Sequence, residues 1–468
     1  EKNPSSIYEY TTKGNLVAVI SNGTAVLGLG DIGAEASKPV MEGKGLLFKI
    51  FADINVFDIE INEKDPDKFI EIVKGISPTF GGINLEDIKA PEAFYIEQRL
   101  KEELNIPLMH DDQHGTAIIS AAALINALEL ADKKIDEVKM VVNGAGAAAI
   151  ACTKLYIALG LKKENVLMCD SKGVINHKRE NLTPEKLDFI AQTDISTLEQ
   201  ALEGADVFVG LSKGDVMTAK MLSSMAENPV VFALANPTPE IDYNLAIATR
   251  PDVIMATGRS DFPNQVNNVL GFPYIFRGAL DVQATGINEE MKLAAVKAIA
   301  ELAKEPVPEM VKLAYNVKNI GFGREYFIPK PFDNRLLTKV SIAVAKAAME
   351  SGISRKPIAD FEEYENQLLD RMGRDEKLIR MMQNRARSNP KRVTLGNAEE
   401  YNVLKAAQIL YEEGIAHPIL LGEKKFIKEQ MEKFGIHLDV PIVDPMDDDQ
   451  DENRKKYRET LWRLRNRK

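Results

Sequence analysis

Cysteine and long apolar runs are scarce in this chain of 468 residues. The two cysteines, Cys152 and Cys169, could form one bridge at most, which excludes a disulfide-stapled fold and favours a reducing compartment. No uninterrupted apolar run reaches the roughly 18 residues that cross a bilayer, and no basic-then-apolar leader opens the printed sequence. These absences predict a cytoplasmic protein with no membrane partner.

An excess of positive charge is also missing. The chain has 59 Lys plus Arg against 70 Asp plus Glu, a net charge of -11, which argues against nucleic acid as a partner. What is present is ordinary globular composition, with 45% hydrophobic and 28% charged residues. At about 150 residues per domain, the length predicts roughly three domains with cores of their own.

The middle of the chain repeats a short apolar run, a turn and a longer helical stretch. The runs are continuous rather than alternating, as expected for a parallel sheet covered by helices on both faces. The predicted strands are Lys139–Val142, Val166–Cys169, Val207–Gly210, Val230–Leu234 and Val253–Ala256. This pattern predicts an α/β domain with a Rossmann-type, doubly wound parallel sheet at residues 129–355.

The segments on either side predict two further domains. Residues 1–128 mix strands with helices and form a separate α/β or α+β domain. After a boundary at Arg355–Pro357, residues 360–468 begin an αβ alternation that stops after two or three strands, a partial α/β domain. The acidic and basic run from Asp447 to Lys468 is typical of a solvated helix end.

A glycine loop follows the first strand of the middle domain. Asn143–Ala149 fits the pattern G-x-G-x-x-A, with Gly144, Gly146 and Ala149 in the three positions and Ala147 opening a helix. Such glycines let a pyrophosphate approach the backbone at the helix N-terminus. The alternative is a glycine turn that only packs strand on helix. The flanking strand and helix favour a dinucleotide site.

The next strand ends in an acid that predicts the cofactor. Asp170 stands where an acid normally binds the ribose hydroxyls, and Ser171 and Lys172 follow it. A hydroxyl and a cation can receive a 2′-phosphate, so we favour NADP over NAD. A second glycine loop, Gly28–Gly33, has no acid-ended strand at the right distance, and we interpret it as a tight turn.

Carboxylates gather in two segments of the first domain. Glu86 and Asp87 follow a glycine turn, and Asp111 and Asp112 precede an apolar helix. Oxygen ligands of this kind suit Mg²⁺ or Mn²⁺, whereas zinc is disfavoured without nearby cysteine. On spacing alone, surface acids at helix starts, stabilised by the helix dipole, are the more ordinary interpretation.

Three further side chains suit a reaction centre. Lys44 lies between two glycines and beside leucines, where apolar surroundings would lower its pKa enough for a base. Asn236 and Asn268 lie in loops after predicted strands, at the sheet edge where ligands bind. The alternatives are a solvent-facing lysine and amides that bond to nearby backbone.

Taken together, these motifs resemble those of the malic enzymes. The matching segments of the first two domains are Asn22–Gly33, Pro39–Lys44, Gly82–Asp87, His110–Thr116, Asn143–Ala149, Ala235–Pro237 and Pro263–Val269. The chain beyond Pro390–Val393 resembles the start of the phosphotransacetylase-like domain that is fused to large bacterial malic enzymes.

The resemblance implies a fold and an activity. The fold is a malic-enzyme N-terminal α/β domain, a Rossmann-type domain and a partial phosphotransacetylase-like domain. The reaction is oxidative decarboxylation of malate to pyruvate and CO₂, with NADP and a divalent metal.

The resemblance also implies roles for single residues. Lys44 is similar to the family's general base, with Asp111 as its support. Glu86, Asp87 and Asp112 match the metal ligands. Asn236 and Asn268 match the amides that bind the substrate carboxylate.

The sequence departs from the family at two points. The family's general acid is a tyrosine in a Tyr-x-Pro-Gly-Val motif, which this sequence lacks, so we expect that tyrosine in a preceding segment. The phosphotransacetylase-like part is short, and implies an acyl-CoA effector rather than acetyl transfer. The family also implies a homo-oligomer. Two alternatives stay open, namely another NAD(P)-dependent dehydrogenase that needs no metal, and a turnover-impaired regulatory fragment that binds cofactor and acyl-CoA.

Overall fold

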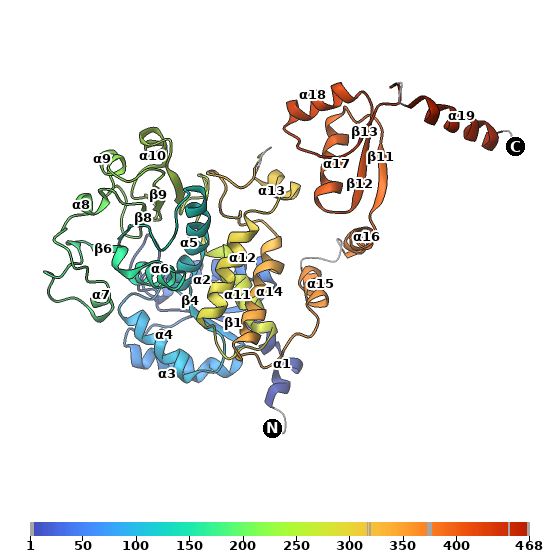
Figure 1. Cartoon of the computed structure of the whole chain (residues 1–468). Coiled ribbons are helices and arrows are strands. Elements are labelled where there is room, and N and C mark those ends of the chain that lie inside the picture. Colours follow the sequence, from blue (N-terminus) through green and yellow to red (C-terminus); the bar gives the residue numbers. More distant parts are fainter. Residues whose placement is uncertain (1–3, 316, 318–319, 372–376, 448–449, 466–468) are drawn as a thin grey trace. The chain divides into compact units, whose positions relative to one another are not determined.

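The computed structural model describes residues 4–315, 317, 320–371, 377–447 and 450–465 (Figure 1). The chain forms two compact units, residues 1–372 and 373–468. The first unit contains the first two predicted domains, residues 1–128 and 129–355, and the boundary between them stays a prediction. No helix among the described residues has both the length and the apolar character needed to cross a bilayer.

The first sheet has four parallel strands in the order β2-β1-β3-β4. They are β1 (Leu16–Ser21), β2 (Asn55–Glu60), β3 (Gly82–Leu85) and β4 (Leu108–His110). Alternate residues of β1 enter two cores, one shared with α2 (Ala34–Ala52) and one shared with α3 (Pro66–Ile76) and α4 (Glu92–Glu103). Helices therefore cover both faces, and β2 is an edge strand.

The second sheet has the order β10-β9-β8-β5-β6-β7, parallel except for β7. Its strands are β5 (Met140–Asn143), β6 (Val166–Asp170), β7 (Gly173–Val174), β8 (Val207–Gly210), β9 (Val230–Ala233) and β10 (Ile254–Thr257). The five predicted strands and the predicted fold class are confirmed. The short antiparallel β7 was not predicted.

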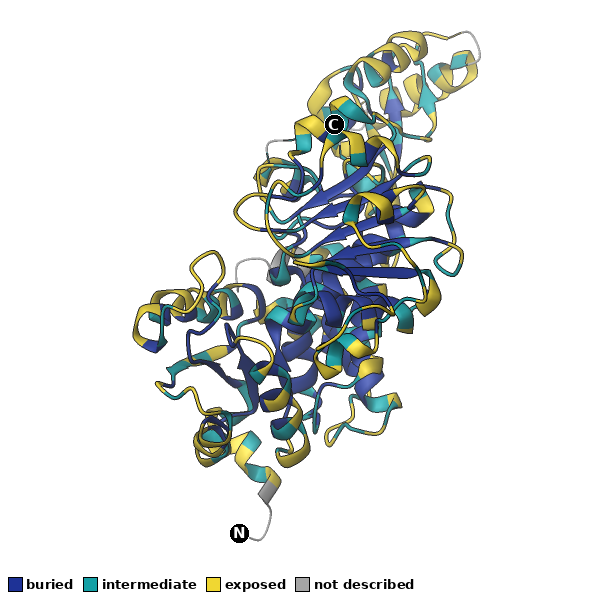
Figure 2. Cartoon of the chain, turned by 90° about the vertical axis from the view of Figure 1, so that its left-hand side faces the viewer, coloured by how far each residue is buried: buried dark blue, intermediate teal, exposed yellow. Residues whose placement is uncertain are grey.

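A single helix joins the two sheets. α5 (Asp111–Leu130) starts directly after β4 and is buried along most of its length. Figure 2 shows most strand residues buried and the exposed residues mainly on the outer helices and loops. It packs on α6 (Ala147–Ala158) and α12 (Glu289–Leu302), and its alanines belong to a core that runs through both sheets. α11 (Phe272–Asp281) and α14 (Arg335–Glu350) complete this core.

The remaining helices of the first unit are short. They are α1 (Ile7–Tyr10), α7 (Pro184–Leu187), α8 (Leu198–Leu202), α9 (Ala219–Ser223), α10 (Tyr243–Thr249) and α13 (Glu309–Ala314). Single 3₁₀ turns lie at Pro4–Ser6, Thr12–Asn15, Ser77–Thr79, Lys163–Asn165 and Asn268–Leu270.

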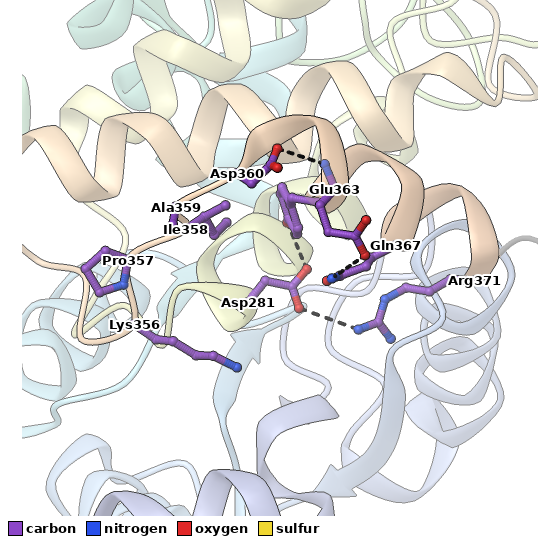
Figure 3. Close-up of a pocket in the computed structure, with 10 residues that line it drawn as sticks. Asp281, Lys356, Pro357, Ile358, Ala359, Asp360, Glu363, Gln367 and Arg371 are labelled. Carbon is purple, nitrogen blue, oxygen red and sulfur yellow. Dashed lines mark hydrogen bonds and ion pairs between the residues drawn. The ribbon is translucent and has the colours of Figure 1, made fainter. Parts of the chain in front are cut away.

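The first unit ends with α15 (Phe361–Arg371), beyond the expected boundary at Arg355–Pro357. The Tyr364 hydroxyl donates to Asp281 at 2.8 Å, and Arg371 pairs with the same carboxylate at 3.7 Å (Figure 3). A cavity of about 360 Å³ lies beneath this contact, and no predicted site residue lines it.

The second unit is a small α/β layer with three parallel strands in the order β11-β12-β13. Its elements are α16 (Lys377–Arg387), β11 (Lys391–Leu395), α17 (Tyr401–Glu412), β12 (Ala416–Leu421), α18 (Lys424–Phe434), β13 (Ile442–Val443) and α19 (Asp451–Arg465). Leu404, Leu420 and Ile427 centre a small core. α19 buries no residue, as the charge pattern predicted.

Candidate functional site

The predicted acids meet at one edge of the first sheet. Glu86 and Asp87 follow β3, and Asp111 and Asp112 follow β4, its parallel neighbour. Parallel neighbours bring their carboxyl ends to the same edge, so the two acidic segments converge. Carboxylate oxygens of Glu86, Asp87 and Asp112 all lie within 4.8 Å of one another, and these three residues are called the acidic cluster below.

Backbone and amide groups hold the acidic cluster in place. Asp87 has a left-handed backbone conformation with φ 53°, and its N–H donates to Asp112 Oδ2 at 2.7 Å. The side-chain amide of Asn84, two residues earlier in β3, donates to Glu86 Oε2 at 2.7 Å. Glu86 and Asp87 are almost fully buried, whereas Asp112 is partly open.

The acidic cluster carries more negative charge than its surroundings offset. Burial, reinforced by the charge of Asp112, raises the pKa of Asp87 to about 7. Burial likewise raises the pKa of Glu86 well above its usual value. The charge of Lys44 lowers this pKa, and the neighbouring carboxylates offset part of that lowering. Carboxylates in this state fit a divalent cation, since a bound cation would keep them ionised at neutral pH. The residues present therefore suit Mg²⁺ or Mn²⁺.

Lys44 reaches the acidic cluster from α2. Its Nζ lies 2.6 Å from Asp111 Oδ2 and 2.8 Å from Glu86 Oε1, over the ring of Phe272 at 4.3 Å. Burial favours the neutral amine, but the carboxylates of Asp111, Glu86 and Asp112 outweigh burial and raise the pKa of Lys44. The expected lowering of its pKa by apolar neighbours is therefore wrong.

Asp111 is the buried link between Lys44 and Asn268. It is 0% exposed, and its Oδ2 also accepts from the Asn268 amide at 3.2 Å. Its Oδ1 has no hydrogen-bond partner among the described residues. Gly115 makes room for this carboxylate, because a Cβ there would lie 2.1 Å from Asp111 Oδ1. The sequence pattern gave no reason to single out Gly115.

The two predicted amides have different surroundings. Asn268 begins a 3₁₀ turn, and its side-chain oxygen accepts from the Thr116 hydroxyl at 3.1 Å, so Thr116 and Asp111 together fix the amide. Asn236 is exposed in the loop after β9, before a cis Pro237. Within the described ranges, no hydrogen bond joins Asn236 to the acidic cluster.

The predicted dinucleotide loop lies between β5 and α6. Gly144 has φ 132°, and a Cβ there would lie 2.5 Å from the carbonyl oxygen of Leu211. Gly146 caps α6, and a Cβ there would meet no atom within 4 Å, so open space faces the helix start. Ala147 is the first residue of α6, and Ala149 is buried against the core. This open cradle suits a pyrophosphate.

The corner at the end of β6 is more basic than the sequence indicated. Arg179 binds both oxygens of Asp170 at 3.0 and 2.9 Å, and Lys186 donates to it at 3.0 Å. Although partial burial acts in the other direction, these bonds hold the pKa of Asp170 well below its usual value. Ser171 and Lys172 are exposed beside it. Arg179 and Lys186 were missed because they lie nine and sixteen residues after Asp170.

Glu240 is another residue that sequence reasoning missed. It is 0% exposed and accepts from the N–H groups of Ser212 at 3.1 Å and Ala235 at 3.0 Å. One buried carboxylate thus ties together the loops after β8 and β9, on the side of the sheet that carries the dinucleotide loop. The other glycine loop is a tight turn, with the Gly30 N–H donating to Val26 O at 2.8 Å.

Three segments of the chain match known protein families. Residues 2–101 match the family described as malic enzyme, N-terminal domain, and residues 113–321 match malic enzyme, NAD binding domain. Residues 377–468 match phosphate acetyl/butaryl transferase.

Two relatives and one solved structure are similar over most of the chain. The Escherichia coli NADP-dependent malic enzyme is 58% identical over 94% of this chain, which spans only 58% of that relative's length. The Halomonas elongata NADP-dependent malic enzyme is 60% identical over 76% of this chain and 84% of its own length. A crystal structure of the Thermotoga maritima NAD-dependent malic enzyme has 46% identity and a TM-score of 0.67, covering 74% of this chain and 87% of that one.

Proposed function

Since the chain belongs to the malic enzyme family, we propose that it catalyses oxidative decarboxylation of malate to pyruvate and CO₂ with reduction of NADP. The observation that carries this proposal is the meeting of Lys44 with the acidic cluster at a buried sheet edge. A 2-hydroxy acid needs a base at its hydroxyl group and a cation at its oxygens, and this arrangement can supply both.

Each residue of the site has a proposed role. Lys44 accepts the proton of the substrate hydroxyl, and Asp111 orients the Lys44 amine through their 2.6 Å contact. Glu86, Asp87 and Asp112 would hold Mg²⁺ or Mn²⁺, which when bound would polarise the C2 oxygen of the substrate and offset the negative charge that builds on that oxygen as CO₂ departs. Asn236 and Asn268 hold the substrate carboxylate.

The charge of the site explains why Lys44 would need a bound metal ion to act as a base. The carboxylates that raise the pKa of Lys44 are Asp111 together with members of the acidic cluster. A divalent cation bound by that cluster offsets their charge, so the ammonium form of Lys44 loses stabilisation. Metal binding therefore favours the neutral amine that a base requires.

The cofactor is proposed to be NADP. Relatives carry names with either cofactor, so similarity alone does not decide the choice. The dinucleotide lies at Gly144, Gly146, Ala147 and Ala149, with its ribose at Asp170. Ser171 and Lys172, with Arg179 and Lys186 beyond them, form a basic corner suited to a 2′-phosphate.

The rest of the proposal concerns partners and compartment. Residues 377–468, by their family match, are proposed to bind an acyl-CoA effector. The chain is proposed to act as a cytoplasmic homo-oligomer. Neither another dehydrogenase nor a turnover-impaired fragment is favoured by any specific contact in the site.

The test is malate-dependent NADPH formation with Mn²⁺. We expect Lys44→Ala or excess chelator to abolish it, and Lys134→Ala to leave it unchanged, because Lys134 is exposed and pairs with the exposed Glu137. Full activity in Lys44→Ala, or in chelator, would sink the proposal.

A further inference from the structure

Glu240 is a buried carboxylate in the loop that follows β9, a strand of the sheet that carries the dinucleotide loop. Its side chain is 0% exposed, and its two oxygens accept from the N–H groups of Ser212 at 3.1 Å and Ala235 at 3.0 Å. Among the described residues, no ion pair joins Glu240 to a lysine, arginine or histidine. A buried charge without a cation is unfavourable, so this carboxylate requires an explanation beyond its local hydrogen bonds.

The hydrogen bonds of Glu240 fit the ionised form. Burial raises the pKa of this carboxyl group, and the two backbone N–H groups act in the opposite direction. Both oxygens are acceptors in these contacts, and an N–H group cannot receive a proton from a carboxylic acid. The carboxylate satisfies both contacts, whereas a protonated Glu240 would find no acceptor in either of them.

The end of β8 makes room for this carboxylate. Gly210 is the last residue of β8, and a Cβ there would lie 2.3 Å from the Cδ atom of Glu240 and 2.5 Å from its Oε1. The loop after β8 is in turn fixed to the dinucleotide loop, because the Asn143 amide donates to the Ser212 hydroxyl at 2.7 Å. The charge of Glu240 is thus held at a defined place among the loops that face the cofactor.

The topology of the sheet indicates which half of a bound dinucleotide belongs near Glu240. The proposed ribose site at Asp170 ends β6, and the proposed pyrophosphate site at Gly144 and Gly146 follows β5. From β6 the sheet continues through β5 to β8 and β9. A dinucleotide that crosses the carboxyl edge in this direction brings its nicotinamide half to the ends of β8 and β9. Glu240 accepts hydrogen bonds from the loops that follow these two strands.

We propose that the Glu240 carboxylate favours the oxidised cofactor over the reduced one, by attracting the positive charge of the nicotinamide ring. The ring of NADP⁺ is cationic and becomes neutral when it accepts a hydride. The attraction therefore acts before hydride transfer and is lost after it, which favours binding of NADP⁺ and release of NADPH. The inference rests on the proposed NADP site and adds to it a residue that selects the redox state of the cofactor.

Binding of both cofactor forms to Glu240→Gln tests the role of the charge. Glutamine has nearly the shape of glutamate and keeps one oxygen for the backbone N–H groups, but it has no charge. Disturbed loops alone would weaken NADP⁺ and NADPH binding equally, whereas loss of the charge weakens NADP⁺ binding alone. In calorimetry of the full chain, we expect the ratio of Kd for NADP⁺ to Kd for NADPH to rise at least about threefold.

Glu164→Gln is the matched control. It removes an exposed carboxylate two residues before β6, at the opposite edge of the sheet from the cofactor loops, and should leave the Kd ratio unchanged. A rise in this control as large as in Glu240→Gln would overturn the inference, because the effect would then come from net charge.

A second variant of Glu240 separates its charge from its hydrogen bonds. Glu240→Asp keeps the charge but is one methylene shorter, so its contacts with Ser212 and Ala235 lengthen. Its Kd ratio should stay within about twofold of the wild type even where both affinities fall. An unchanged ratio in Glu240→Gln, or an equal rise in Glu240→Asp, would overturn the inference alone. Failure of the wild type to bind either form would overturn the proposed cofactor site, and the inference with it.

Discussion

Removing divalent metal should destabilise the protein more at pH 7 than at pH 5. In the metal-free site the pKa of Asp87 is raised from 3.8 to about 7 by burial and by Asp112. Because the folded pKa exceeds the unfolded one, the protonated carboxyl favours the fold at pH 4, and this advantage is lost as pH approaches 7. At about 1.4 kcal/mol per unit, the part of this loss that falls between pH 5 and pH 7 is about 2 kcal/mol.

Urea unfolding at pH 5 and pH 7, with chelator or with Mn²⁺, measures this loss. We expect the stability that Mn²⁺ adds over the chelated protein to be larger at pH 7 than at pH 5. Buried His114, whose pKa is lowered to about 4, contributes the opposite pH trend to both samples and cancels in this difference. Asp87→Asn should make this pH dependence shallower, because the amide does not titrate and only Glu86 keeps a raised pKa. The exposed Asp67→Asn on α3 is the matched control and should behave as wild type. Equal pH dependence in wild type and Asp87→Asn would refute this account of the acidic cluster.

Three further substitutions test single contacts. Gly146→Val should leave thermal unfolding nearly unchanged but raise KM for NADP at least about tenfold, because its side chain would fill the open cradle rather than the core. Arg179→Gln should reduce the kcat/KM preference for NADP over NAD by about tenfold, since it removes one cation from the basic corner; an equal loss with both cofactors would contradict this role. Gly115→Ala should displace Asp111 and lower kcat by about 100-fold, whereas Gly75→Ala should not, and normal kcat in Gly115→Ala would show that the close approach of its Cβ is tolerated.

Sequence reasoning predicted those parts of the fold that local patterns determine. Continuous apolar runs located five of the six strands of the second sheet within a residue or two, because both faces of a parallel sheet must be apolar. β7 was missed because two residues carry no periodicity. α15 was missed because long-range contacts anchor it, such as Tyr364 with Asp281, 83 residues earlier in the chain.

The same distinction between local patterns and long-range contacts applies to the candidate site. Spacing alone did not group the acids, whereas the family resemblance implied Glu86, Asp87 and Asp112 as one set. The structure brings their carboxylate oxygens within 4.8 Å of one another, because β3 and β4 are parallel neighbours. The pKa of Lys44 could not be predicted, since its direction depends on Asp111, 67 residues away, rather than on the adjacent leucines. The basic partners of Asp170 depend likewise on how a loop folds back on β6.

The joining helix α5 has a consequence for how the chain tolerates insertions. Its first turn carries Asp111 and Asp112, while its later turns pack against α6, which opens at the dinucleotide loop. The helix α5 thus fixes the orientation of Asp111 and Asp112 relative to the dinucleotide loop. A single residue inserted in its middle would turn the acids by about 100° relative to α6, so α5 should tolerate substitution far better than any change of length.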